Sequence, residues 1–141
     1  MLKIVSGSFE DLKREMKQAS DLKKQEIKSW KKKLKDSKSN TDKRLAIERN
    51  IEKEEKFTKI MFVPSKVLPV KVGGIVINYK AYQSFVKKIE RLESQISLSG
   101  GCLRIDYKTG RYSKGYVEFA DLREYFEGFV SLPEAKIIEK D

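Results

Sequence analysis

Residues 9–35 repeat apolar side chains every three to five positions within a charged stretch, and this pattern constrains the fold most. Side chains three or four residues apart share one face of an α-helix, so the spacing predicts one long helix. Ser8 is placed to cap its first turn, with Asp11 three residues later. The only tryptophan, Trp30, falls on the apolar face, as does Leu34. We therefore expect Trp30 to pack against a second helix or a partner and not to stack on a base.

A polar break, DSKSNTD, separates this helix from a second amphipathic segment that ends near Lys56. A short polar link between two amphipathic helices predicts an antiparallel helical hairpin. Because the second segment has few apolar residues, the hairpin is expected to project from the core or to pack on a partner. Ahead of the first helix, LKIVS predicts a short strand at residues 2–6.

Beyond residue 56 the sequence takes on β-type character. The run FTKIMFVP predicts an extended segment at residues 57–64, which Pro64 ends. Two apolar runs flank Gly73 and Gly74, and this arrangement predicts a β-hairpin of residues 67–72 and 75–79. Pro69 has no N–H to donate to a ladder, so its strand is expected at a sheet edge.

Further along the chain, apolar residues at helical spacing predict a helix at residues 81–97. The run CLRIDY alternates apolar and polar residues, which is typical of a half-buried strand. It turns through KTGRYSKG and returns as YVEF. Asp121 begins a short predicted helix, and residues 131–141 fit either a helix or a strand.

Residues 77–89 and 117–129 share one spacing of apolar residues, which suggests two successive β-hairpin-plus-helix units. Any strand that runs into an amphipathic helix has the same spacing, so the repeat is a hypothesis. The predicted fold is α+β. Residues 1–60 hold the short strand and the basic helical hairpin, and residues 61–141 form an α+β body of the two units.

The formal net charge is +10 and is unevenly distributed. Residues 12–35 contain 10 basic and 3 acidic side chains, and residues 71–115 contain 9 basic and 3 acidic ones. Residues 116–141 are acidic, with 7 carboxylates and 3 basic side chains. Basic segments suit phosphate backbones, anionic lipid or an acidic protein surface, although lysine-rich chains are also simply soluble.

The chain lacks the residue types that several kinds of catalytic and metal site require. The chain has no histidine and a single cysteine, Cys102, which argues against His-dependent catalysis, zinc clusters and an internal disulfide. No phosphate-binding loop is present. We therefore expect a non-enzymatic protein with no cofactor and no metal.

The lone cysteine and the absence of an apolar leader or spanning run favour a cytoplasmic, intracellular location without membrane contact.

One enzymatic hypothesis uses Asp106 and Lys108, which have the acid-x-Lys spacing of Mg-dependent nucleases. The same spacing occurs eight times in this lysine-rich chain, so chance accounts for it equally well. Glu90 or Glu93 would have to supply a second carboxylate. Nuclease activity is therefore the third alternative.

The second basic segment carries the residues predicted to bind nucleic acid, because cations neutralise phosphates and exposed tyrosines stack on unpaired bases. These residues are Arg104, Lys108, Arg111, Tyr112 and Lys114. Strand alternation places Tyr107 toward the core, whereas Tyr112 lies in the turn. Tyrosines are also simply common in strands. On the first helix, a basic face is expected to add attraction to the phosphate backbone without base readout, through Lys28, Lys31, Lys32 and Lys35.

The sequence therefore predicts a basic protein that binds nucleic acid or a nucleoprotein complex, DNA or RNA, mainly through the backbone. The alternative is an inhibitor or adaptor that binds a nucleic-acid-handling protein, with Glu118, Asp121, Glu124 and Glu127 mimicking phosphates. In composition alone the chain resembles small phage and mobile-element proteins, including anti-CRISPR inhibitors. That resemblance assigns no residues.

Overall fold

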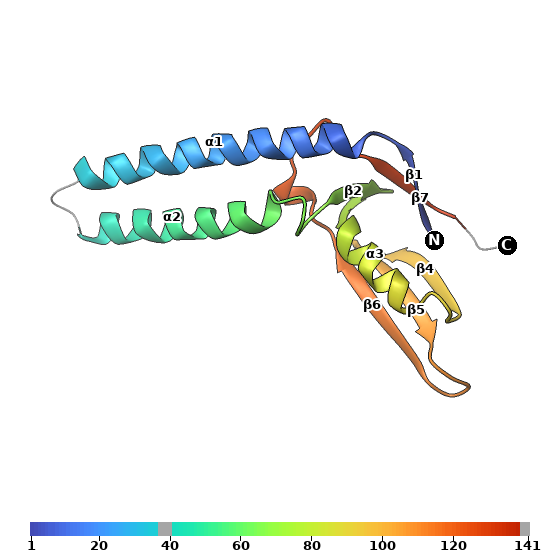
Figure 1. Cartoon of the computed structure of the whole chain (residues 1–141). Coiled ribbons are helices and arrows are strands. Elements are labelled where there is room, and N and C mark those ends of the chain that lie inside the picture. The colour runs from blue at the N-terminus through green and yellow to red at the C-terminus, as the bar shows by residue number, and fades with distance from the viewer. Residues whose placement is uncertain (37–40, 139–141) are drawn as a thin grey trace. The chain divides into compact units, whose positions relative to one another are not determined.

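The computed structural model describes residues 1–36 and 41–138, and it divides into two compact units (Figure 1). One unit, here called the helical unit, is Lys13–Lys66. The other, here called the body, combines Met1–Leu12 with Val67–Asp141. Each unit is described by itself.

In the helical unit, α1 (Phe9–Asp36) and α2 (Thr41–Met61) run antiparallel and side by side (Figure 1). The link at residues 37–40 lies outside the described residues. Lys23 Nζ lies 3.2 Å from Glu54 Oε2 and thereby joins the two helices. Burial of Lys23 alone would lower its pKa, but the carboxylates of Glu54 and Glu26 outweigh this effect and raise it. The predicted helical hairpin is confirmed.

The second helix is longer than predicted. It continues to Met61, so the extended segment predicted at residues 57–64 is wrong. Two local contacts accompany this last part of the helix. The hydroxyl of Thr58 donates to the Glu54 carbonyl one turn earlier, at 2.7 Å, and the ring of Phe57 meets that of Phe62 edge-on at 5.3 Å.

The predicted apolar stripe of α1 is only partly buried. Met16 and Ile27 are buried, Trp30 and Leu34 are half-buried, and Leu22 remains 66% exposed. The half-buried state of Trp30 agrees with its predicted place on the stripe.

The body contains a four-stranded sheet in the order β1-β7-β2-β3. Its strands are β1 (Leu2–Ser6), β7 (Glu134–Ile137), β2 (Pro69–Val72) and β3 (Ile75–Asn78). The tail that fitted helix or strand is therefore a strand, antiparallel to β1 and parallel to β2. Because β1 pairs with β7, it lies in the body and not in one segment with the helical hairpin, as residues 1–60 were predicted to form.

The edge position predicted for Pro69 is wrong, because β2 lies between β7 and β3. Proline is tolerated there because it is the first residue of the strand. The pairing with β7 involves only Lys71 and Val72, which follow it. The tight β2–β3 turn is confirmed, with Gly73 at φ +60°.

The second sheet is an antiparallel meander in the order β4-β5-β6. Its strands are β4 (Ser94–Ser99), β5 (Cys102–Lys108) and β6 (Lys114–Ala120). The hairpin of β5 and β6 was predicted, but β4 was not, because it occupies the end of the helix predicted at residues 81–97. The observed helix is α3 (Tyr79–Lys88). Asn78 caps its start, because the Asn78 side-chain oxygen accepts from the N–H groups of Lys80 and Ala81.

The second hairpin unit differs from the first. After β6 the short helix predicted from Asp121 is a 3-10 helix of three residues, η1 (Arg123–Tyr125), whereas the first unit has the longer α3. The α+β class and the order of a helical region followed by a strand-rich body are confirmed.

The core of the body joins the two sheets and α3, and its buried residues include Val70, Ile77, Tyr82, Leu103 and Ile105. Aromatic rings from α3 and the meander extend it. Tyr82 and Phe119 meet edge-on at 6.2 Å, and so do Phe85 and Tyr107 at 5.7 Å. Tyr107 therefore faces the core, as strand alternation predicted.

Candidate nucleic-acid interface

The turn between β5 and β6 contains four of the residues predicted to bind nucleic acid, namely Lys108, Arg111, Tyr112 and Lys114. Lys108 and Lys114 form the last pair of the ladder. The turn closes through the N–H of Thr109, which donates to the Ser113 carbonyl at 2.9 Å. The residues between the two lysines, 109–113, are all exposed. We call residues 108–114 the basic tip.

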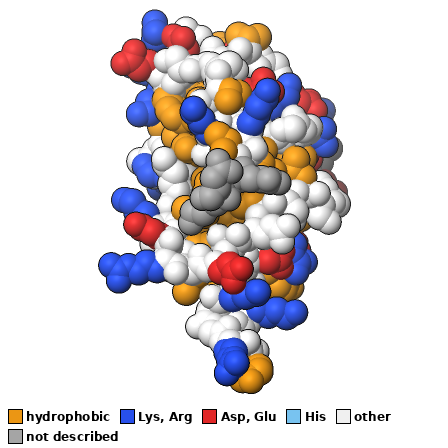
Figure 2. All heavy atoms as spheres, turned by 90° about the vertical axis from the view of Figure 1, so that its right-hand side faces the viewer, with side chains coloured by type: hydrophobic (Ala, Val, Ile, Leu, Met, Phe, Trp, Pro, Cys, Tyr) orange, Lys and Arg blue, Asp and Glu red, His pale blue; other side chains and the backbone are white. Residues whose placement is uncertain are grey.

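The basic tip combines positive charge with an open aromatic ring. Its three cations are Lys108, Arg111 and Lys114, and it contains no acidic residue. Arg111 and Lys114 form no ion pair with any described residue, while Lys108 Nζ lies 3.5 Å from Glu93 Oε2. Tyr112 is 92% exposed. Figure 2 shows Lys/Arg and hydrophobic side chains at its lower end, where this turn lies, with the acidic side chains higher up.

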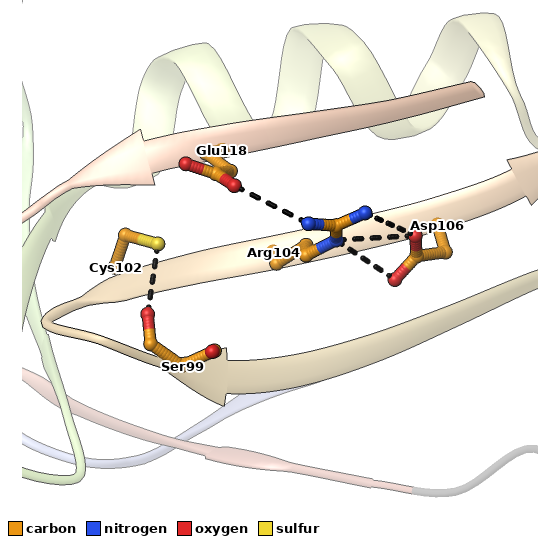
Figure 3. Close-up of polar contacts among 5 residues, drawn as sticks. All are labelled: Ser99, Cys102, Arg104, Asp106 and Glu118. Atoms are coloured by element: carbon orange, nitrogen blue, oxygen red, sulfur yellow. Dashed lines mark hydrogen bonds and ion pairs between the residues drawn. The ribbon is translucent and has the colours of Figure 1, made fainter.

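Arg104, also predicted to contact phosphate, lies in the middle of β5 among internal partners (Figure 3). Its Nε donates to Asp106 Oδ1 at 3.1 Å, and one terminal nitrogen lies 3.5 Å from Glu118 Oε1. The hydrogen bond to Asp106 raises the pKa of the guanidinium further. Two carboxylates therefore compete with phosphate for Arg104, and its phosphate contact stays a prediction.

The same guanidinium packs on a tyrosine that was not among the predicted site residues. The Cζ atom of Arg104 lies 4.0 Å from the ring centroid of Tyr116, within the range of a cation–π contact. Tyr116 is 59% exposed and lies opposite Asp106 in the ladder. The register of the hairpin was the signal that could have found it.

A hollow of about 660 Å³ lies on this sheet beside the basic tip. Its lining includes Gln95, Arg104, Asp106, Lys114 and Tyr116. Pockets of roughly 300–1,000 Å³ hold small molecules or single groups of larger ligands. The hollow thus combines an aromatic ring, an amide and charged groups in one place.

The four predicted lysines of α1 lie in the helical unit, and all four are exposed. We call Lys28, Lys31, Lys32 and Lys35 the lysine flank. Lys31 Nζ lies 2.7 Å from Glu55 Oε1, and this hydrogen bond lowers the pKa of Glu55. The other three lysines form no ion pair with any described residue.

A shallow groove between α1 and α2 borders the lysine flank. Its lining includes Lys24, Lys28, Lys31 and Lys59, with Glu55 as the one carboxylate. The groove adds positive surface but no exposed aromatic side chain.

The residues of the nuclease hypothesis are occupied by other contacts. Both carboxylate oxygens of Asp106 accept from Arg104 Nε, at 3.1 and 3.2 Å, and Lys108 lies near Glu93. Cys102 donates to the Ser99 carbonyl at 3.0 Å. Burial, together with Glu118, raises the pKa of the Cys102 thiol, which disfavours the reactive thiolate.

The acidic end has a structural use for part of its charge. Asp121 Oδ1 accepts from the N–H of Val76 and of Arg123, each at 3.0 Å. Burial alone would raise the pKa of Asp121, but these bonds and the Arg123 guanidinium outweigh it and lower the pKa. Glu118 is engaged with Arg104. Two of the four proposed phosphate mimics therefore already have partners within the body.

None of the helices in the described part of the chain has the continuous apolar length that a membrane span requires. A scan against protein-family models and searches of curated proteins and of solved structures find no significant match to this chain. The interface is therefore argued from its residues and their geometry.

Proposed function

We propose that this protein binds nucleic acid, alone or within a nucleoprotein complex, through the basic tip and without catalysing a reaction. One observation carries the proposal. The tip presents three cations around a tyrosine that is 92% exposed, with no acidic residue in the turn. Cations on a turn neutralise phosphates of a strand, and an exposed ring is the group that stacks on a base.

The lysine flank adds a second, backbone-directed contribution. Lys28, Lys32 and Lys35 follow one another at helical spacing on α1 and are exposed. Lysine ammonium groups attract phosphates as point charges without reading the bases. We therefore expect binding that depends strongly on salt and weakly on sequence.

The alternative, an inhibitor or adaptor that mimics phosphates with its acidic end, has less support. Glu118 already bonds Arg104, and Asp121 already caps a turn through the N–H groups of Val76 and Arg123. A phosphate mimic needs carboxylates that are available to the partner.

The proposal is tested by fluorescence anisotropy at 50 and 200 mM salt, with a 20-nucleotide single strand, the matching duplex and an RNA hairpin as probes. Three phosphate contacts predict about a 20-fold loss of affinity for the single strand over this range. Engagement of the lysine flank predicts a larger loss. The absence of binding to all three probes at 50 mM salt would contradict the proposal.

A further inference from the structure

We propose that the outward face of the β4-β5-β6 sheet is a nucleobase site, and that the ligand of the basic tip is single-stranded nucleic acid. Tyr112 and Tyr116 are the two stacking residues. This inference rests on the proposed function and names its substrate class.

The ladder register assigns residues to the two faces of this sheet, because directly opposed residues of antiparallel strands share a face. Ile105 and its partner Val117 face the core. The neighbouring rung therefore faces outward, and it consists of Gln95, Asp106 and Tyr116. The next outward rung toward the turn is the pair of Lys108 and Lys114. The tip and Tyr116 thus lie on one continuous face.

Tyr116 is held in position on this face. Arg104 covers one face of its ring at 4.0 Å, and Arg104 is itself fixed by Asp106 and Glu118. Tyr116 nevertheless remains 59% exposed and is therefore open to a ligand. A ring fixed in this way loses little side-chain entropy when a base stacks on it.

The charges along this face favour one orientation of the ligand. The basic tip carries three cations with Glu93 as the nearby counter-charge, so phosphates are attracted there. Beside Tyr116, Arg104 is compensated by two carboxylates, Asp106 and Glu118, which repel a phosphate but not an uncharged base. A strand bound at the tip would therefore place its backbone on the lysines and a base over Tyr116.

The hollow of about 660 Å³ lies where this base would sit, with Gln95 and Tyr116 in its lining. Gln95 is exposed, and its amide can both donate to and accept from a base edge. In a duplex the base faces are already stacked, so a tyrosine ring gains access only to an unpaired base. These features together favour a single strand over a duplex.

The test compares the affinities of variants for a labelled 12-nucleotide DNA strand, the same RNA strand and a 12-base-pair duplex. Tyr112→Leu and Tyr116→Leu should each weaken single-strand binding by about 5- to 150-fold, the range of one lost stacking contact. Duplex binding should change by less than about 2-fold, because phosphate contacts alone support it. Tyr116→Phe retains the ring and should bind single strands within about 2-fold of the wild type.

A matched control is Tyr125→Leu, because Tyr125 is a partly exposed tyrosine, 37% exposed, on η1 and outside the lining of the hollow. It should leave all three affinities unchanged. Far-ultraviolet circular dichroism checks that each variant is folded.

The outcomes separate this inference from the proposed function. If single strands bind but Tyr116→Leu does not weaken them, or if the duplex is preferred, the nucleobase site is wrong while nucleic-acid binding stands. If no probe binds at 50 mM salt, both fail. If DNA and RNA strands differ in affinity while both depend on Tyr116, the site stands and the preferred strand is identified.

Discussion

The basic tip presents three cations around an exposed tyrosine on a sheet that is anchored in the core, whereas the lysine flank presents four lysines on a helix whose apolar stripe is partly open. The two surfaces differ in what they can recognise. Cations alone attract the phosphate backbone of any nucleic acid, and an aromatic ring adds affinity only for unpaired bases. Charge is therefore distributed over both units, and we expect base contact in the body, where the exposed Tyr112 lies.

The units also differ in how completely their apolar residues are buried, since Ile105 is fully buried whereas the stripe of α1 is partly exposed. Truncation of a buried side chain in each unit tests this difference. Ile105 is fully buried beneath the outward sheet face, so Ile105→Ala should lower the free energy of unfolding by about 2–5 kcal/mol. Ile27→Ala in α1 should cost about 2 kcal/mol, at the low end of that range, because the sparse stripe around it relaxes more easily. Urea unfolding followed by circular dichroism measures both. Equal costs would contradict the difference.

The second prediction concerns the basic tip. Replacing Lys108, Arg111 and Lys114 by alanine should weaken single-strand binding by about 100-fold at 0.1 M salt, because three phosphate contacts are lost. The matched control replaces three exposed lysines of the four-stranded sheet by alanine, which lowers the net charge equally. These are Lys3, Lys71 and Lys136. Similar losses in both variants would show that binding follows total charge and not the tip.

The third prediction concerns the lysine flank. Alanine at Lys28, Lys32 and Lys35 should weaken single-strand binding by about 10-fold, which corresponds to between one and two lost phosphate contacts at 0.1 M salt. The loss should be no smaller for the duplex, because these point charges attract phosphates without contacting bases. Lys31 is left in place because it pairs with Glu55. Anisotropy with both probes measures the effect. A loss larger than that of the tip variant would reverse the ranking of the two surfaces.

The smallest effect is expected away from both surfaces, at Asp121. Asp121→Ala removes the acceptor of two backbone N–H groups and should lower the free energy of unfolding by about 1 kcal/mol at pH 7 without changing nucleic-acid affinity. Because the pKa of Asp121 is lowered in the folded state, its stabilisation is complete above about pH 4. It is lost as the pH falls through the lowered value.

Urea unfolding at pH 7 and at pH 2.5 checks this linkage. The difference between wild type and Asp121→Ala should shrink at the lower pH, whereas Glu127→Ala should show little difference at either pH. A difference for Asp121→Ala that is the same at both pH values would contradict the assigned role of its carboxylate.

Elements governed by local pattern were predictable from the sequence. The helix predicted at residues 9–35 is α1 (Phe9–Asp36), and the strands of the CLRIDY hairpin are β5 and β6. In these segments, apolar periodicity and turn residues favour the same structure. The exposed position of Tyr112 followed from the same turn.

The errors arose where two local patterns overlap or where pairing is non-local. Ile89, Leu92 and Ile96 continue the helical spacing, but SQISLS also alternates, and pairing with β5 makes it a strand. The parallel pairing of β2 with β7 joins residues more than sixty positions apart, and no local signal marks it. This pairing is what moved Pro69 away from the edge.

In the candidate site, too, features set by local spacing were predictable and features set by strand pairing were not. Arg104 and Asp106 lie two residues apart on one strand, so a period-2 interpretation could have placed them on one face. The approach of Glu118 and Tyr116 to Arg104 depended on the β5–β6 register. Without that register, Arg104 resembled a free cation, and its internal partners were not expected.

Binding of a single strand at the basic tip can be observed residue by residue. The ¹⁵N-labelled full chain is titrated with an unlabelled 12-nucleotide single strand, and the amide chemical-shift changes are followed. Binding at the basic tip predicts the largest changes at residues 108–116, with smaller ones along the lysine flank. Changes confined to the acidic residues near Asp121, or spread evenly over all exposed lysines, would contradict it.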